Sequence, residues 1–266
     1  MVTVDATSVP RAAPSRRPLT IMGTGIDLMP GADVLARLAG APASAAWQLA
    51  FVNAHSLNLA HDDPDFRAVL GRCRLVLNDG VGVKLAAAMR GVRIDENLNG
   101  SDFTWRVLTI AAANGWRVFL YGGLPGVGAS AAGRLRAAID GLEIAGILDG
   151  YQPLSDAQVA DAVSRARADV VIVALGQPLQ EAWLDRHLPA TGCRLGVGVG
   201  AFLDFTAGRI PRAPAWMNRA GIEWLYRLTH EPTRLWRRYV FGIPRFLWHA
   251  WWARPRDRRP QREGRT

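Results

Sequence analysis

The residues best suited to chemistry are acidic and amide side chains that follow runs of apolar residues. Asp79 comes directly after the apolar part of LVLNDGVGV and is followed by Gly80 and Gly82. Glycines let a ligand or a neighbouring backbone come close, so a carboxylate at such a place can face a cleft and act as a general base. An aspartate before a helix is also a common N-cap. The sequence leaves both interpretations of Asp79 open.

Four amide side chains lie at similar points. Asn53, Asn78 and Gln177 each follow an apolar run, and Gln180 opens the helix expected after the run VVIVA. Amide groups can hydrogen-bond a sugar or a nucleotide base. A helical first turn in which Glu181 complements the helix dipole is the simpler alternative, but it accounts for the glutamate and not for two glutamines flanking a proline.

Asp204 and a glycine-rich turn complete the candidate site. Asp204, in GAFLDFTAG, is either a buried hydrogen-bonding anchor or a ligand contact. Gly122 and Gly123 belong to YGGLPGVGAS, a strand-to-helix turn whose backbone N–H groups and helix dipole could hold a phosphate, although a plain tight turn is the commoner explanation. The turn has neither the lysine of a Walker A loop nor the GxGxxG spacing of a dinucleotide site.

Metal and hydrolase chemistry find no support in the sequence. The five histidines show no HExxH or similar pairing, and no serine lies in a GxSxG context. Cys73 and Cys193 lie far apart without CxxC spacing, which favours a reducing compartment. We therefore expect no metal ligands and no cofactor.

The elements that must position these residues alternate in the pattern of a βαβ protein. Apolar runs predict strands at Ala46–Val52, Leu75–Leu77, Arg117–Tyr121, Glu143–Leu148, Val170–Ala174 and Arg194–Val199. Stretches of helical period predict helices near 56–70, 83–90, 102–113, 128–139, 156–167 and 179–187. Because the strands are nearly continuous apolar runs, helices should cover both faces of a parallel sheet. The carboxyl ends of its strands meet at one rim, so the candidate residues should share one polar cleft.

The composition is that of a globular protein with an unusual C-terminal part. The chain has 266 residues, of which 49% are hydrophobic and 21% charged, and it can bury a core without disulfides. Its net charge of +9 is unevenly placed, since residues 205–266 hold 14 arginines but only 4 acidic residues, together with 6 of the 10 tryptophans. The apolar stretch 239–252 is interrupted by Pro244 and Arg245 and is shorter than the roughly 20 residues that a membrane span needs.

Arginine mixed with tryptophan suits two kinds of partner. Arg227, Arg234 and Arg237 are spaced by seven and three residues, which places them on one face of a helix if Pro232 merely interrupts it. The interleaved Trp and Tyr residues favour an amphipathic helix at an anionic membrane surface. The alternative is a nucleic-acid-binding α/β protein that uses this segment as a basic arm and whose affinity falls steeply with salt.

Taken together, the motifs resemble the WecG/TagA/CpsF family of bacterial glycosyltransferases (glycosyltransferase family 26) over about residues 20–248. The resemblance is carried, in the family's order, by FVNAHSLNLA, LNDGVGVKLAAAMRG, GSDF, VFLYGGLPGV, VALGQPLQEAWL, GVGAFLDFTAGRIPRAPAW and GIEWLYRLTHEPTRLWRRY. It implies a Rossmann-like core and a C-terminal helical appendage that docks on the membrane and completes the active site. It also implies metal-independent, inverting transfer of a sugar from a UDP-sugar to a polyprenyl-diphosphate-linked saccharide.

The resemblance places this reaction in exopolysaccharide or other cell-surface polysaccharide synthesis, with a peripheral enzyme at the cytoplasmic face of the inner membrane and no nucleic-acid partner. Asp79 matches the family's proposed base, which deprotonates the acceptor hydroxyl. Asn53 and Gln180 match polar residues of the pocket, and Asp204 matches an acid of the same cleft. The family's appendage arginines, placed to stabilise the leaving diphosphate, are matched by Arg227, Arg234 and Arg237.

Two positions depart from the members that transfer N-acetylmannosamine. Phe51 stands where they tend to have Thr, and Asn97 stands where they carry Arg. The run ENLNGSDF is more similar to exopolysaccharide members such as the xanthan glucosyltransferase. UDP-glucose, UDP-glucuronic acid and UDP-N-acetylmannosamine are therefore all candidate donors.

The sequence divides into four expected parts. These are a disordered arm (1–17), the catalytic domain (18–208), the Arg/Trp-rich helical appendage (209–252) and a disordered basic tail (253–266). Members of the family can associate, so the resemblance also allows a homo-oligomer.

Overall fold

The computed structural model describes residues 19–214, 217, 223–230 and 232–253. Five side chains within these ranges lie outside the description: Glu223, Arg227, His230, Arg234 and Leu235. The two segments expected to be disordered, 1–17 and 253–266, lie outside the described residues apart from Ala253.

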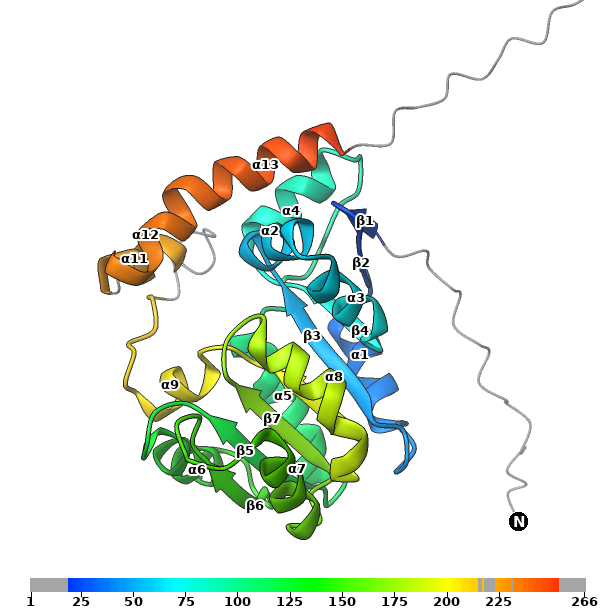
Figure 1. Ribbon diagram of the computed structural model, residues 1–266, viewed down its shortest axis with the longest axis vertical. Helices are drawn as coiled ribbons and strands as arrows, with labels where there is room; N and C mark the ends of the chain where they lie inside the picture. The colour runs from blue at the N-terminus through cyan, green and yellow to red at the C-terminus, as the bar shows by residue number, and fades with distance from the viewer. Residues whose placement is uncertain (1–18, 215–216, 218–222, 231, 254–266) are drawn as a thin grey trace, which may run out of the picture.

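The centre of the fold is a six-stranded parallel sheet in the order β4-β3-β8-β7-β5-β6 (Figure 1). Its strands are β3 (Trp47–Val52), β4 (Leu75–Asn78), β5 (Arg117–Gly122), β6 (Glu143–Leu148), β7 (Val170–Ala174) and β8 (Leu195–Gly198). Each of them coincides within a residue or two with an apolar run, because a strand covered on both faces needs apolar side chains at successive positions. The predicted α/β class with a parallel sheet is confirmed.

Helices cover both faces of this sheet. They are α1 (Gly31–Ala39), α2 (Ala54–Asp62), α3 (Pro64–Arg72), α4 (Val81–Ala88), α5 (Gly100–Ala113), α6 (Val127–Ala138), α7 (Asp156–Arg165), α8 (Leu179–Thr191) and α9 (Phe202–Ala207). On one face Leu49 and Phe51 of β3 join a core with residues of α1, α5, α6 and α9. On the other face Ala50 and Val52 of the same strand join residues of α2, α3 and α4. Alternate side chains of one strand thus enter opposite layers, as the pleat requires.

One predicted helix, 56–70, is wrong and is replaced by the two helices α2 and α3. The backbone leaves the helical conformation at Asp63, whose carboxylate accepts hydrogen bonds from the backbone N–H groups of Asp65 and Phe66 and so caps α3. Pro64 occupies the first position of α3, where its missing N–H costs nothing. The chain also forms elements that the apolar runs did not predict, namely α1, α9 and an antiparallel hairpin of β1 (Leu19–Ile21) and β2 (Thr24–Ile26).

The C-terminal segment forms a row of helices that arches over one side of the domain (Figure 1). Its described elements are α11 (Glu223–His230), α12 (Pro232–Trp236), the π-helical turn η1 (Arg237–Phe241) and α13 (Gly242–Trp252). The helix α13 packs on α2 and α4, and it buries Phe246 and Ala250 completely. Among the described residues, no helix is both long and apolar enough to cross a membrane.

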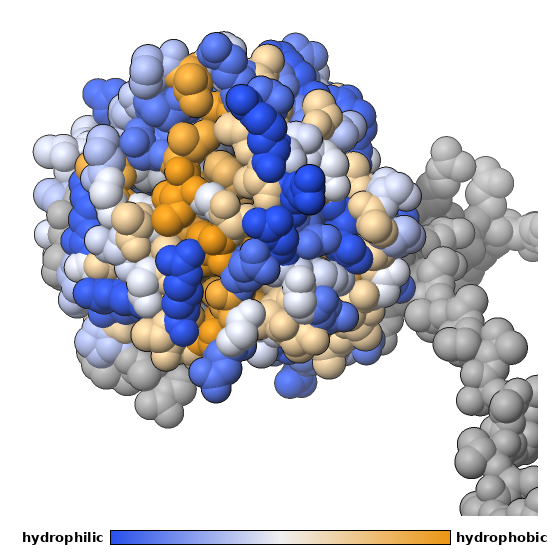
Figure 2. Space-filling model, turned by 90° about the horizontal axis from the view of Figure 1, so that it is seen from below, coloured by the Kyte–Doolittle hydropathy of each residue, from blue (hydrophilic) through white to orange (hydrophobic). Residues whose placement is uncertain are grey.

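The opposite end of the molecule has an incompletely covered sheet edge. Figure 2 views it from below, the side where α6, α7 and β6 lie in Figure 1, and a band of hydrophobic residues crosses this surface between hydrophilic ones. The strand at this edge, β6, leaves Ile147 and Leu148 only half-buried. The cavity described next lies elsewhere, at the carboxyl ends of the strands.

Candidate active site

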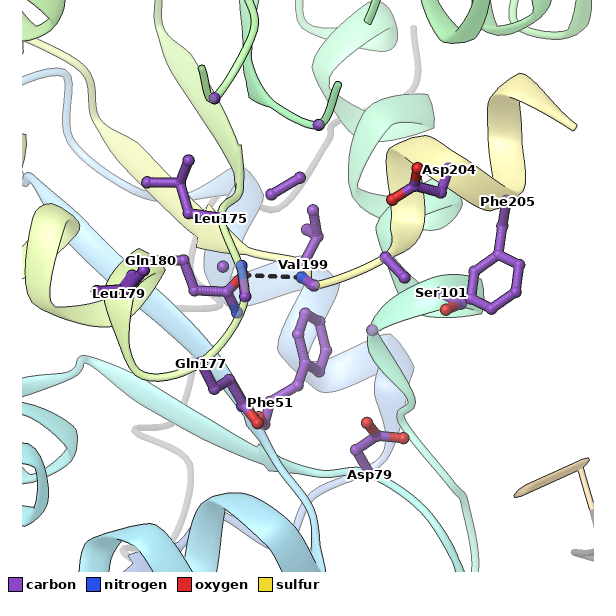
Figure 3. A pocket seen from close by; sticks show the side chains of 18 of the residues that line it. Phe51, Asp79, Ser101, Leu175, Gln177, Leu179, Gln180, Val199, Asp204 and Phe205 are labelled. Carbon is purple, nitrogen blue, oxygen red and sulfur yellow. Dashed lines mark hydrogen bonds between the residues drawn. The ribbon is translucent and has the colours of Figure 1, made fainter. Parts of the chain in front are cut away.

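A cavity of about 810 Å³ lies at the carboxyl ends of β3, β4, β5, β7 and β8 (Figure 3). The chain winds from β3 to β4 toward one edge of the sheet and from β5 to β6 toward the other, so the winding reverses above β8 and β7. Ligand sites of open α/β sheets form at such a reversal. The single polar cleft expected from the sequence is present, and the candidate residues that line it are Asn53, Asp79, Gly123, Gln177, Gln180 and Asp204.

Asp79 lies directly after β4, with its carboxylate facing the cavity (Figure 3). Its Oδ2 accepts a hydrogen bond of 3.3 Å from the amide nitrogen of Asn53. The N-cap of α4 is not Asp79 but Gly80, which has φ +89° and therefore a conformation that glycine adopts readily. The backbone N–H of Gly80 donates to Oδ1 of Asn97 at 2.8 Å. Capping of α4 therefore does not use the side chain of Asp79.

The side chain of Asn53 is held in one orientation. Its Oδ1 accepts from the backbone N–H groups of His55 and Ser56 and thereby caps α2. The same oxygen accepts from Nη2 of Arg238 at 3.2 Å. With the oxygen committed to three donors, the amide nitrogen must point the other way, toward Asp79. The cap of α2 therefore also orients the carboxylate of Asp79.

A buried network beneath the cavity connects three strand ends. The side-chain oxygen of Gln180, Oε1, accepts hydrogen bonds from the backbone N–H of Gly176 at 3.2 Å and from that of Gly200 at 2.9 Å (Figure 3). Its nitrogen donates to Oε1 of Glu181, which is fully buried. Gln177 donates to the backbone oxygen of Phe51 at 2.7 Å. The two glutamines thus fix the loops that form the cavity floor.

Burial has a strong electrostatic effect on Glu181. It raises the pKa of this carboxyl to about 7, although hydrogen bonds from Gln180 and Gln177 oppose the shift. Its second oxygen, Oε2, has no hydrogen-bond partner among the described residues. Glu181 does lie in the first turn of α8, where it can complement the helix dipole, but its side chain is also fully buried.

The remaining candidates divide between shaping and lining the cavity. Gly122 has φ +121°, and a Cβ atom at this position would lie 2.4 Å from the backbone oxygen of Ala174, so only glycine fits there. Gly123 follows and lines the cavity. Asp204 lies in the first turn of α9, faces the cavity and forms an ion pair of 2.8 Å with Arg209. The ion pair makes Asp204 an anchor, and its contact with a ligand stays a prediction.

No group of three or more His, Cys, Asp or Glu side chains suited to a metal ion occurs in the part of the chain that the structure describes.

Comparison with known proteins identifies the family. The model of the glycosyl transferase WecG/TagA/CpsF family matches residues 19–260. The chain belongs to this family. It is 34% identical over 188 residues to the N-acetylglucosaminyldiphosphoundecaprenol N-acetyl-beta-D-mannosaminyltransferase of Bacillus spizizenii, covering 71% of this chain and 72% of the relative. It is 32% identical over 195 residues to the enzyme of the same name from Bacillus subtilis, covering 73% of this chain and 75% of the relative.

Membership makes this protein a glycosyltransferase, and it gives the cavity its chemical context. Not every residue predicted for the site lines the cavity of this family member. Asn78 is buried, and its amide nitrogen donates to the backbone oxygen of Glu96 at 3.1 Å. Arg237 is exposed, with its guanidinium 5.5 Å from the centre of the Trp236 ring. The side chains of Arg227 and Arg234 lie outside the described residues.

Arg238 and His55 line the cavity beside Asn53 and were not among the predicted site residues. Arg238 reaches the cavity from η1 and contacts Asn53. His55, in the first turn of α2, lines the same wall, and burial together with the Arg238 guanidinium lowers its pKa to about 4. A regular helix would place Arg238 about 20° from Arg227 and Arg237 about 80° from it, so the spacing of seven and four residues was a signal for Arg238 that the sequence-based prediction did not use. The apolar run before His55 was visible, but a lone histidine carries no specific pattern.

Both positions that depart from the N-acetylmannosamine-transferring pattern lie at this site. Phe51 lines the cavity and packs its ring against Phe103, at 6.3 Å between centroids. Its ring also approaches Gly100 so closely that a Cβ there would lie 3.1 Å from it. Asn97 holds the backbone next to Asp79. Changes at these two positions therefore alter the wall of the cavity and the support of Asp79.

Proposed function

We propose that this protein transfers a sugar from a UDP-sugar to a saccharide linked to polyprenyl diphosphate, with inversion and without a metal ion. The observation that carries the proposal is the carboxylate of Asp79, which faces the cavity of a family glycosyltransferase and is oriented by Asn53. The names of both Bacillus relatives support the acceptor class, since they describe transfer to an N-acetylglucosaminyl diphosphoundecaprenol.

In the proposed reaction Asp79 takes the proton of an acceptor hydroxyl. The resulting oxygen attacks the anomeric carbon of the donor sugar from the face opposite UDP, the new glycosidic bond forms, and the bond to the diphosphate breaks. The electron pair and the negative charge leave with UDP. Positive or N–H groups at the diphosphate lower the energy of this step. Candidates are the backbone at Gly122 and Gly123 and the arginines 227, 234 and 237 of the C-terminal segment.

The donor is proposed as a UDP-hexose or UDP-N-acetylhexosamine. The relatives' names favour N-acetylmannosamine. The aromatic ring of Phe51 at the cavity wall and Asn97 beside Asp79 favour testing UDP-glucose and UDP-glucuronic acid as well. Gln177, Gln180 and Asp204 are the polar groups of the cavity that such donors would meet. The product would serve exopolysaccharide or other cell-surface polysaccharide synthesis.

A membrane surface is the proposed location, on the cytoplasmic side. Five aromatic residues of the C-terminal helices expose between 41% and 63% of their surface, namely Trp236, Phe241, Trp248, Trp251 and Trp252. Exposed tryptophans among arginines are typical of helices that lie in the interface of an anionic bilayer. Such a position would bring the cavity to the diphosphate of a lipid-linked acceptor.

The deciding experiment compares the wild type with Asp79→Asn in a transfer assay on membranes that contain lipid-linked acceptors. UDP-glucose, UDP-glucuronic acid and UDP-N-acetylmannosamine are offered in parallel with EDTA, and products are detected by mass spectrometry. We expect transfer from one donor by the wild type, and a loss of about 10²- to 10⁴-fold in D79N, the range for a missing general base.

The matched control is Asp140→Asn, which removes an exposed carboxylate from the turn after α6 and should leave transfer unchanged. Asp79 is partly exposed and lies at the rim, so D79N should keep the melting temperature of the wild type. Wild-type turnover retained in D79N would remove the base assignment, and inhibition by EDTA would remove the metal-independent mechanism.

A further inference from the structure

The last helix and α2 lie side by side in parallel (Figure 1). Three contacts fix their register from the amino to the carboxyl ends. At the amino end, Nη2 of Arg238 donates to Oδ1 of Asn53. Further along, Nδ2 of Asn58 donates to the backbone oxygen of Gly242 at 2.8 Å. At the carboxyl end, Nη1 and Nη2 of Arg245 bind the carboxylate of Asp62. The aromatic rings of His61 and His249 pack at 4.5 Å between centroids.

These contacts come from one face of the C-terminal helix. Arg238, Gly242, Arg245 and His249 are spaced by four, three and four residues, the spacing of one helical face. Phe246, next to this face, is 0% exposed. Arg237, the preceding residue of η1, is exposed. Docking of the helix on α2 therefore brings Arg238, and not its neighbour, to the cavity.

A π-helical turn precedes α13 and contains Arg238. A π-helix adds one residue to a turn, so η1 (Arg237–Phe241) rotates the face of α13 relative to the helices before it. Such turns are frequent at functional sites. Phe246 of α13 enters the core beside α4, and Arg238 of η1 contacts Asn53.

We infer that Arg238 is a positioning residue of the active site. Its guanidinium holds Oδ1 of Asn53, Asn53 holds the carboxylate of Asp79, and the docked helix α13 holds Arg238. The inference rests on the proposed role of Asp79 and adds to it a dependence of the base on the seating of the C-terminal helix. The Asp62–Arg245 ion pair lies at the far end of α2, roughly 13 Å along the helix from Asn53, and acts on the site only through this seating.

The first test measures placement without any activity. Histidine NMR titration follows His55, whose pKa of about 4 depends on burial and on the Arg238 guanidinium. Arg238→Gln should raise the midpoint of His55, and Arg245→Glu, which breaks the remote ion pair with Asp62, should raise it as well. A double variant with the reversed charges, Asp62→Arg with Arg245→Asp, should restore the wild-type midpoint. An unchanged midpoint in R238Q would overturn the placement of Arg238.

The second test measures turnover. Arg238→Ala should lower kcat at least tenfold while the KM for the donor changes less than about threefold, and added guanidinium ion should restore part of kcat. Arg165→Ala, which removes an exposed arginine of α7, is the matched comparison, and the inference requires a larger loss in R238A than in R165A. The charge-reversed pair should recover the kcat that R245E loses.

The outcomes separate this inference from the proposed function. Turnover retained in D79N would overturn the role of Asp79 and with it the positioning of Asp79 by Arg238. An inactive D79N together with an R238A variant as active as R165A would overturn the role of Arg238 alone. Equal effects of R238A on kcat and on the KM for the donor would make Arg238 a donor-binding group and would also overturn the inference.

Discussion

Replacing Glu181 with glutamine tests the account of the buried network beneath the cavity. Glu181 is 0% exposed, and burial raises its pKa from 4.5 to about 7. The unfolded chain releases this proton near the ordinary pKa, whereas the folded protein retains it until about pH 7. The free energy of unfolding is therefore highest below pH 4.5, the ordinary pKa of Glu181, and falls as the pH rises to about 7, its pKa in the folded protein.

The size of the loss follows from the shift. Each pKa unit corresponds to about 1.4 kcal/mol, so ionisation of Glu181 costs the folded state about 3 kcal/mol at pH 8, most of which is absent at pH 5. A glutamine cannot ionise, and its oxygen can still accept from Gln180. Its amide nitrogen would replace Oε2, which has no partner among the described residues, so E181Q adds a cost that is independent of pH.

The measurement is urea unfolding of the wild type and E181Q at pH 5 and pH 8. We expect the wild type to lose about 2 kcal/mol more stability than E181Q between the two pH values. D140N, which removes an exposed carboxylate, should keep the pH dependence of the wild type. Equal pH dependences of wild type and E181Q would refute the argument that Glu181 is a desolvated carboxyl.

Three further variants test other parts of the structure. Gly122→Ala should fold poorly or have a much lower melting temperature in calorimetry, because its Cβ would collide with the backbone oxygen of Ala174. A wild-type melting temperature would contradict the geometry. Phe246→Ala should release α13 at a cost of about 3–5 kcal/mol, seen as faster proteolysis after residue 236 with an intact core. The wild type should lose stability as the pH falls from about 6.5 to 4, because His55 has a lowered pKa only in the folded protein, and His55→Gln should make this loss smaller. An unchanged loss would show that His55 is not buried beside Arg238.

The sheet could be predicted because its information is local. Runs such as VVIVA at β7 are apolar at every position, which only a strand covered on both faces needs, and the polar residues that follow them must then meet at one rim. Asp79 could be identified as a candidate for the same reason. The family motifs added the reaction class, because they record residue types in a fixed order and need no geometry.

Other local features were present in the sequence but required a different interpretation. The break between α2 and α3 is encoded by Asp63 and Pro64, a cap followed by a proline, within an otherwise helical pattern. The hairpin of β1 and β2 has strands of only three residues, too short for a period to be recognised.

Only the tertiary structure decided which polar groups act together. The hydrogen bond between Asn53 and Asp79 joins residues 26 positions apart, and that between Arg238 and Asn53 joins residues 185 positions apart. Arg238 reaches Asn53 because α13 docks on α2 and α4, with Phe246 buried in the core that they share. Residue types and spacing determine periodicity along a single element, whereas contacts between elements depend on how their faces pack, and that packing fixed the site.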